Sequence, residues 1–440
     1  MDGHWCAPSA LAILTDVESA SMSGLFDVWM PRAMGALVAR QKAKKTKAAK
    51  GRSRARRAEV QALRSAGSDS SMDESLIEAL PKIDALQDVP SFGDMRVDQS
   101  QADAFQAFVD ELCAAGEDAM ASAMRMGVVV RLDRGFPLVA TEGLTLRAEH
   151  AVAFAKGADM LPAVGDVVAV RCDPGHDMGV IERVLPRRTT FERWRGKNRG
   201  ERQVLAANVD IIFIVQPLGA ARDSVKLMCD RISRSLVLVN DCGATPVVVL
   251  TKADRCDADE LADAVRHIEN LVGEGIRVLV TSSADGRGLD EVRACIPKGT
   301  CGMILGESGA GKSTMLNALL GHEALATSGV RERDDMGRHT TVARVMVALP
   351  DPCGVIADAP GLRSLPLVGH ERGLARTFPE VVDAARACRF NDCTHTHEPG
   401  CAVLEAVEAE EINRARVDAF LALAGEMRVS AQSLDPDIHL

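Results

Sequence analysis

Residues 306–314 read Gly-Glu-Ser-Gly-Ala-Gly-Lys-Ser-Thr and directly follow the apolar run Cys301–Leu305. The segment fits the pattern G-x-x-x-x-G-K-[ST], and residues 315–320 continue it with apolar side chains at helical spacing. Glycines allow backbone N–H groups to turn toward phosphates, and the helix N-terminus adds the positive end of a dipole. The alternative is a chance glycine-rich loop, but the strand before it and the helix after it favour a nucleotide-phosphate site.

Two residues of this loop have specific expected contacts, and the loop as a whole is expected to surround the phosphates. Lys312 is expected to contact the β- and γ-phosphates, and Ser313 to ligate Mg²⁺. The residues expected to surround the phosphates are Gly306, Glu307, Ser308, Gly309, Ala310, Gly311, Lys312, Ser313 and Thr314.

Two further segments are typical of the same site. Asp358-Ala-Pro-Gly361 follows a strand candidate, so Asp358 is placed to hold Mg²⁺ through water and Gly361 to present its N–H to the γ-phosphate. The loop Gly337-Arg-His-Thr-Thr341 lies between the phosphate loop and Asp358, and a Thr hydroxyl there could complete the Mg²⁺ shell when GTP orders the loop. Thr340 is the preferred ligand over Thr341, and the alternative is a polar loop with no such role.

The segment Leu250-Thr-Lys-Ala-Asp254 resembles the guanine-specificity motif [NT]-K-x-D of GTPases, with Thr251 in place of the more usual Asn. The Asp254 carboxylate can accept hydrogen bonds from N1–H and the N2 amine of guanine, and adenine offers neither donor. The stem of Lys252 can cover the base plane. In Val280-Thr-Ser-Ser-Ala284, which resembles the loop that supports the guanine oxygen, either Ser282 or Ser283 could occupy the contacting position.

The order of these motifs is unusual. In most GTPases the phosphate loop comes first and base recognition last. Here base recognition at 251–254 and 281–283 precedes the phosphate loop at 306–314 and the Asp-Ala-Pro-Gly segment at 358–361. Because every motif ends a strand, a circularly permuted chain can build the same pocket.

Cys388, Cys393, His395 and Cys401 form a C-x4-C-x-H-x5-C pattern. Three thiolates and one imidazole within a short stretch suit a structural, tetrahedral Zn²⁺. His397 could replace His395, which is the preferred ligand, and the alternative is a set of reduced thiols without metal.

The rest of the chain indicates further domains. Short apolar runs between residues 126 and 184 alternate with Gly, Pro and Asp, which predicts a small barrel of the oligonucleotide-binding type. The spacing of Phe105, Phe108, Val109, Leu112 and Cys113 predicts a helix before it. After residue 203, strands alternate with helices at 222–237 and 257–272, which is typical of a mostly parallel sheet. Residues 402–428 are expected to be helical.

Net charge and composition narrow the range of possible partners and of the compartment in which the protein acts. The net charge is −10, yet residues 40–57 hold ten basic residues and no acid, so the remainder carries −20. A second basic stretch covers residues 187–202, and phosphate contact depends on such local density. No apolar run reaches the ~18 residues of a membrane span. Scattered cysteines favour a cytoplasmic protein over a disulfide scaffold, and the lack of Tyr argues against base stacking.

Taken together, these motifs resemble the ribosome small-subunit-dependent GTPase A family over about Met126 to Cys401. The resemblance implies a multidomain chain with an N-terminal OB-fold β-barrel, an α/β P-loop GTPase core with circularly permuted motifs, and a C-terminal zinc-binding helical domain. It also implies late maturation of the small ribosomal subunit, contact with its rRNA, and hydrolysis of GTP stimulated by that subunit. We expect a monomer with one Zn²⁺, and Mg²⁺ bound with GTP.

The expected domain boundaries follow from the composition of the chain and the positions of its motifs. The expected domains are an N-terminal extension at 1–122, the barrel at 123–186, a basic linker at 187–202, the GTPase domain at 203–383, and the zinc domain with its C-terminal helix at 384–440. The extension is longer than the family's usual short basic N-terminus, and residues 58–97 are expected to be a polar linker that could include a short helix.

The expected mechanism depends on which group orients water. Leu362 follows Gly361, where many GTPases have a Gln, so intrinsic hydrolysis is expected to be slow. His339 is the candidate that positions water, together with Lys312 and Thr340 as catalytic residues; the alternative is that His339 only stabilises its loop. Two other functions stay open: an RNA-binding assembly factor with a structural nucleotide site, and a nucleotide-dependent metabolic enzyme such as a small-molecule kinase.

Overall fold

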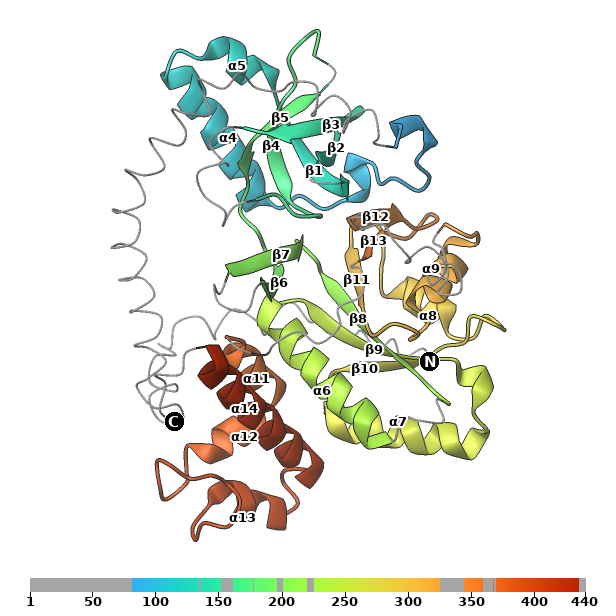
Figure 1. Ribbon diagram of the computed structural model, residues 1–440, viewed down its shortest axis with the longest axis vertical. Helices are drawn as coiled ribbons and strands as arrows, with labels where there is room; N and C mark the ends of the chain where they lie inside the picture. Colours follow the sequence, from blue (N-terminus) through green and yellow to red (C-terminus); the bar gives the residue numbers. More distant parts are fainter. Residues whose placement is uncertain are drawn as a thin grey trace, which may run out of the picture. The chain divides into compact units, whose positions relative to one another are not determined.

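The computed structural model (Figure 1) describes residues 81–133, 136–151, 161–176, 178–195, 201–219, 225–324, 344–358, 367 and 369–434. These described residues fall into two compact units. One unit contains residues 81–382 and 410–434, and the other contains residues 383–409. Within the described residues, no helix is long and apolar enough to cross a membrane.

The first part of the larger unit is a closed barrel, as predicted. Its strands are β1 (Met124–Asp133), β2 (Phe136–Thr141), β3 (Leu144–His150), β4 (Val167–Arg171) and β5 (Gly179–Val184). They pair in the order β1-β2-β3-β5-β4, and β4 returns to β1. The register shifts between Val129 and Arg131, and this irregularity bends β1. The interior is filled by small branched side chains such as Val129, Val168 and Ile181.

The predicted helix before the barrel is α4 (Gln99–Ala114). Asp98 caps it by accepting a hydrogen bond from the Gln101 backbone N–H. Phe108 and Leu112 are buried, but Cys113, which the spacing places on the same stripe, is exposed. A short helix, α5 (Asp118–Ala123), leads into β1.

The described part of the segment before α4, residues 81–97, packs against the barrel, although residues 58–97 were expected to be a polar linker. The short turns Ile83–Ala85 and Phe92–Asp94 form 3-10 helices. Apolar side chains of this segment pack against Val130, Leu138 and Ala140 of the barrel; they are Ile83, Leu86, Val89 and Met95. Phe92 and Val97 pack against a second group of buried residues that includes Val128 and Val167. The spacing of these apolar residues follows no helix or strand period.

The second part of the larger unit is the predicted α/β sheet. Its strands run in the order β10 (Arg277–Val280), β9 (Thr245–Thr251), β8 (Ile211–Pro217), β11 (Cys301–Leu305), β13 (Val355–Asp358) and β12 (Arg344–Ala348). All neighbours are parallel except β12, which is antiparallel to β13. The carboxyl ends of the parallel strands therefore meet at one edge, where ligands bind in such sheets.

Helices cover this sheet because its strands are apolar on both faces. Residues of α8 (Leu289–Ala294) and α9 (Lys312–Leu320) pack against one set of strand side chains that includes Phe213 and Val249. The alternate residues Ile212 and Ile214 are also fully buried. Helix α6 (Val225–Cys242) packs against β8 and β9, and α7 (Ala258–Val272) packs against α6 and β10.

The barrel and the α/β sheet are joined in the larger unit. Strand β1 pairs with β12 through Arg131↔Val345 and Leu132↔Arg344, so one sheet of 11 strands runs through both parts. In the basic stretch 187–202, expected to be a linker, residues 190–195 and 201–202 instead belong to the antiparallel pair of β6 (Thr190–Arg195) and β7 (Glu201–Ala207).

The C-terminal region is divided differently from the expected unit 384–440. Helices α13 (Ala402–Glu408) and α14 (Arg414–Leu434) cover most of the stretch 402–428, which was expected to be helical, and α11 (Glu371–Thr377) and α12 (Pro379–Ala385) precede them. Helix α14 belongs to the larger unit, where Arg416 donates to the backbone oxygens of Leu271 and Thr377 at 2.6 and 2.7 Å. The smaller unit is thus confined, among described residues, to the Cys/His segment and α13.

Candidate functional site

The phosphate loop connects the end of β11 to the start of α9. Gly309 and Gly311 have φ angles of +83° and +91°, a left-handed region that residues with a Cβ rarely adopt. At Gly306 a Cβ would lie 2.6 Å from the Val215 backbone oxygen of the neighbouring strand. The glycines of the motif are thus required by turn geometry and by close packing, and α9 begins at Lys312 with its N-terminal N–H groups at the loop.

Lys312 reaches back across this loop. Its Nζ donates hydrogen bonds to the backbone oxygens of Gly306, at 2.7 Å, and Glu307, at 2.6 Å. The ammonium group therefore lies at the start of the loop, beside the backbone that the motif assigns to phosphate binding. Ser313 and Thr314 follow in the first turn of α9.

The base-recognition motif touches the phosphate loop directly. Thr251 ends β9, and its buried hydroxyl donates to the Ala310 backbone oxygen at 2.7 Å. Lys252 has a left-handed φ of 62° and donates from Nζ to the Gly309 backbone oxygen at 2.7 Å. Burial lowers the pKa of the Lys252 ammonium, Arg255 adds to this effect, and Asp254 opposes it. Two motifs separated in the permuted sequence thus form one site.

Ser282 and Asp254 pair within that site. The buried Ser282 hydroxyl donates to a carboxylate oxygen of Asp254 at 2.9 Å. The Thr281 backbone N–H donates to the Leu250 oxygen at 2.7 Å, which aligns the two loops. Of the two serines left open by the sequence, Ser282 is the one that orients the carboxylate, and the half-buried Ser283 is the next residue along the loop.

Asp358 comes to the same edge of the sheet. It is the last residue of β13 and pairs in register with Ile304, next to the end of β11. The remaining predicted residues of this site, Gly361, His339 and Thr340, lie outside the described residues, as does Leu362.

One contact of the phosphate loop involves a residue that belongs to no sequence motif. Arg231 of α6 forms an ion pair of 3.0 Å with the Glu307 carboxylate. No sequence pattern marks Arg231, because a basic residue on an amphipathic helix is most often a solvated one. The pair becomes apparent only in the three-dimensional structure, where α6 places Arg231 beside Glu307.

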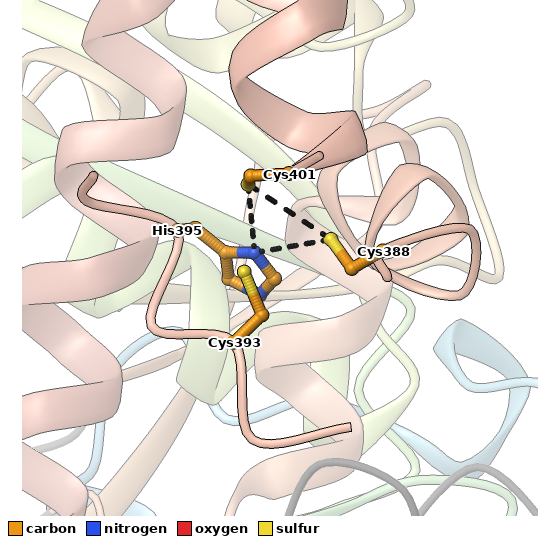
Figure 2. A group of neighbouring side chains, drawn as sticks. All are labelled: Cys388, Cys393, His395 and Cys401. Atoms are coloured by element: carbon orange, nitrogen blue, oxygen red, sulfur yellow. Dashed lines mark hydrogen bonds between the residues drawn. The ribbon is translucent and has the colours of Figure 1, made fainter. Parts of the chain in front are cut away.

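The smaller unit holds the predicted metal ligands (Figure 2). One ligand atom from each of Cys388, Cys393, His395 and Cys401 lies within 4.8 Å of all the others. The sulfurs of Cys388 and Cys401 are 3.9 Å apart, and each lies 3.5 Å from His395 Nδ1. Zinc bonds of ~2.3 Å to sulfur and ~2.1 Å to nitrogen, arranged as a tetrahedron, give spacings of about 3.8 Å and about 3.6 Å. The residues therefore fit a tetrahedral zinc ion.

The local chemistry of the Cys/His segment agrees with this fit. Burial raises the pKa of the Cys393 thiol to about 12, so a cation is needed to stabilise its thiolate. His395 is buried, whereas His397 is exposed and its Nδ1 lies 2.8 Å from the Thr396 hydroxyl. The Glu398 carboxylate accepts from the backbone N–H groups of Thr394, at 3.0 Å, and Thr396, at 3.2 Å. It thereby holds the turn between the second and the last cysteine.

Comparisons with known proteins agree with this arrangement. Residues 184–368 match the family model described as RsgA GTPase. A Streptomyces avermitilis protein named small ribosomal subunit biogenesis GTPase RsgA is 42% identical over 301 residues, which are 68% of this chain and 79% of that protein.

Solved structures show the same fold. The crystal structure of YjeQ from Thermotoga maritima has a TM-score of 0.53 and 27% identity, covering 69% of this chain and 99% of that one. The structure of YloQ, described as a circularly permuted GTPase, has a TM-score of 0.51 and 23% identity, covering 70% of this chain and 96% of that one.

The permuted motif order, the joined base and phosphate loops, the barrel before them and the Cys/His cluster after them are features of this chain, and its similarity to these relatives extends over most of their length. This chain belongs to the RsgA GTPase family and is a GTPase with circularly permuted motifs.

Proposed function

We propose that this protein hydrolyses GTP to GDP and phosphate when stimulated by the small ribosomal subunit, and that it acts as a late maturation factor of that subunit. The support is its membership of the family and the name of its relatives, small ribosomal subunit biogenesis GTPase RsgA. The same relatives support action in the cytoplasm, where ribosomes assemble, and we expect the protein to act as a monomer.

The assignment of nucleotide binding rests on the hydrogen bonds between the base-recognition motif and the phosphate loop. Thr251 and Lys252 bond to the backbone oxygens of Ala310 and Gly309, so residues for base and phosphate recognition share one site. In the proposed complex, Asp254, oriented by Ser282, accepts from N1–H and N2 of guanine. The Ser283 backbone N–H supports the guanine oxygen, and residues 306–314 surround the phosphates.

The site also suits a divalent cation. Ser313 and Thr340 are the proposed Mg²⁺ ligands, with Asp358 acting through water, and hydroxyl and carboxylate oxygens are the ligands this ion prefers. When bound, Mg²⁺ would neutralise part of the phosphate charge. Gly361 would donate its N–H to the γ-phosphate, and Lys312 would add a fixed positive charge beside it.

Hydrolysis requires an oriented water molecule. Leu362 follows Gly361 and cannot hydrogen-bond to water, so the free protein is expected to turn over slowly. We assign water positioning to His339 once the subunit orders its loop. A purely structural role of His339 in that loop is the alternative, and a His339→Ala variant that keeps full subunit-stimulated turnover would support the alternative.

The remaining parts are assigned to binding the subunit. The barrel at 123–186 is proposed to contact rRNA, helped by the basic residues at 40–57 and 187–202 on either side of it in sequence. Contacts of this kind follow phosphate position and RNA shape, so they need few aromatic residues. Zinc held by the Cys/His cluster is proposed to be structural, because all four ligand positions are filled by protein side chains.

The switch in subunit affinity is the direct test of this function. The protein is loaded with GDP or with a non-hydrolysable GTP analogue, and its binding to purified small subunits is measured by sedimentation. We expect the GTP-like form to bind at least about tenfold more tightly, a difference of about 1.4 kcal/mol. Equal affinity of the two forms would contradict a nucleotide-controlled cycle.

A further inference from the structure

We propose that Arg231 is a positioning residue of the phosphate site, which compensates the charge of Glu307 and so preserves the affinity of the loop for a nucleoside triphosphate. The inference rests on the proposed function, because it assumes that the phosphate loop binds GTP. It adds a residue of α6 that belongs to none of the nucleotide motifs.

The first observation is the acidic residue within the loop. Glu307 is the only acidic residue between Gly306 and Thr314. Its backbone oxygen accepts the 2.6 Å hydrogen bond from Lys312 Nζ, so the residue lies beside the ammonium group assigned to the phosphates. A carboxylate here has the same sign as the ligand. Repulsion between like charges is strongest at short distance, and at the exposed Glu307 it is screened by water and salt.

The second observation is the cation that faces this carboxylate. A guanidinium nitrogen of Arg231 lies 3.0 Å from a Glu307 carboxylate oxygen, with the two side chains 25% and 52% exposed. Arg231 is therefore half-buried while Glu307 is exposed, so water and salt screen the pair mainly from the Glu307 side. Without Arg231, the carboxylate would repel the phosphates and would also compete with them for the Lys312 ammonium.

The third observation is that α6 holds Arg231 in a fixed place. Ile232 and Ser233, the next two residues, are buried, and the helix packs against β8 and β9. One turn later, Arg234 pairs with Glu426 of α14, which ties the same helix to the C-terminal helix. The guanidinium is thus carried by a packed element, which is what a charge-compensating group requires.

The test is a set of four variants of the full-length protein: Arg231→Ala, Arg231→Lys, Glu307→Gln and the double variant Arg231→Ala/Glu307→Gln. Arg266→Ala is the matched control, because Arg266 also pairs with an acid, Asp263, but in an exposed pair within α7. Dissociation constants for GDP and a non-hydrolysable GTP analogue are measured with Mg²⁺ by calorimetry, at low and high salt.

The proposal predicts a charge-dependent loss. Arg231→Ala should weaken binding of the GTP analogue about tenfold and of GDP about threefold, because the triphosphate carries more charge. High salt should reduce both losses. Arg231→Lys should retain most of the affinity, and the double variant should bind within about twofold of Glu307→Gln, since removing the carboxylate removes the need for its partner.

Other results would overturn the proposal. They are Arg231→Ala binding both nucleotides like Arg266→Ala, equal losses for GDP and the GTP analogue, or a double variant as weak as Arg231→Ala alone. A wild-type protein that binds neither nucleotide would contradict the proposed function itself, so the two failures are distinguishable.

Discussion

Asp254 and Ser282 form the smallest unit of the proposed guanine site. The carboxylate offers two acceptors to a base edge that has two donors, and the 2.9 Å hydrogen bond from Ser282 fixes its direction. Thr251 shows why Asn is not required before Lys252. Its hydroxyl already makes the 2.7 Å contact with Ala310 that links the base motif to the phosphate loop.

Asp254→Asn should weaken GTP binding by about a hundredfold or more, because hydrogen bonds to a charged group contribute about 1.5–3 kcal/mol each. The amide would also present a donor toward donors on the base. Competition calorimetry with GTP measures the effect, and Asp263→Asn on the exposed face of α7 is the matched control. An Asp254→Asn variant that still binds GTP like the control would refute the assignment of guanine recognition.

The two histidines of the Cys/His segment give a second residue-scale prediction. His395→Ala removes a buried nitrogen that lies 3.5 Å from two of the sulfurs, whereas His397→Ala removes an exposed ring. Elemental analysis of the purified full chain should find one zinc ion in the wild type and in His397→Ala, and a clear loss in His395→Ala. If His397→Ala lost the metal and His395→Ala kept it, the ligand assignment would be reversed.

At the scale of elements, the buried cation of Arg416 is one of the contacts that hold α14 to the rest of the larger unit. Arg416 donates to the Leu271 and Thr377 oxygens and pairs with Glu380 at 2.5 Å, while Phe420 packs edge-to-face on Phe378. Each of these partners lies on a different segment from α14. The helix thereby closes over the ends of α7, α11 and α12.

Arg416→Ala should lower the free energy of unfolding by about 3 kcal/mol, because it leaves two backbone oxygens and a carboxylate without their donor. Thermal unfolding should show a melting temperature lower by several degrees. Arg414→Ala, in the exposed pair with Asp418 on the same helix, should leave the melting temperature within about one degree. Equal shifts in the two variants would show that the buried contacts of Arg416 contribute nothing special.

The elements also show what sequence reasoning can and cannot predict. The phosphate loop, the barrel strands and the Cys/His set were predictable, because turn glycines, apolar runs and close ligand spacing are local signals. The sequence predicts a linker where β6 and β7 pair, because the basic composition of this segment hides the strand pattern. The attachment of α14 and the Arg231–Glu307 pair depend on contacts between distant segments, which no local pattern encodes.

At the scale of the whole molecule, we propose that binding to the small subunit depends on the uneven distribution of charge along the chain. The chain has a net charge of −10, yet residues 40–57 carry ten basic residues. This stretch lies outside the described residues, so its role is argued from composition alone. A dense positive segment binds RNA phosphates by releasing counterions, and such binding weakens steeply as salt increases.

Deleting residues 40–57 should weaken binding to the small subunit and make it less sensitive to salt, with GTP affinity unchanged. Deleting residues 1–18, an equally long segment without Lys or Arg, is the control. Sedimentation with purified subunits at several salt concentrations measures both slopes. The same affinity and slope for the two deletions would remove the basic segment from the proposed interface.

The central claim is that the small subunit switches on a GTPase that is slow by itself. The most direct measurement is GTP turnover by the full chain, with and without purified small ribosomal subunits, using Lys312→Ala to correct for contaminating activity. We predict stimulation of about tenfold or more, which corresponds to about 1.4 kcal/mol of barrier, and its loss in Lys312→Ala. Turnover that is the same with and without subunits, together with undiminished subunit binding by Lys312→Ala, would contradict the claim and indicate an assembly factor whose nucleotide site is structural.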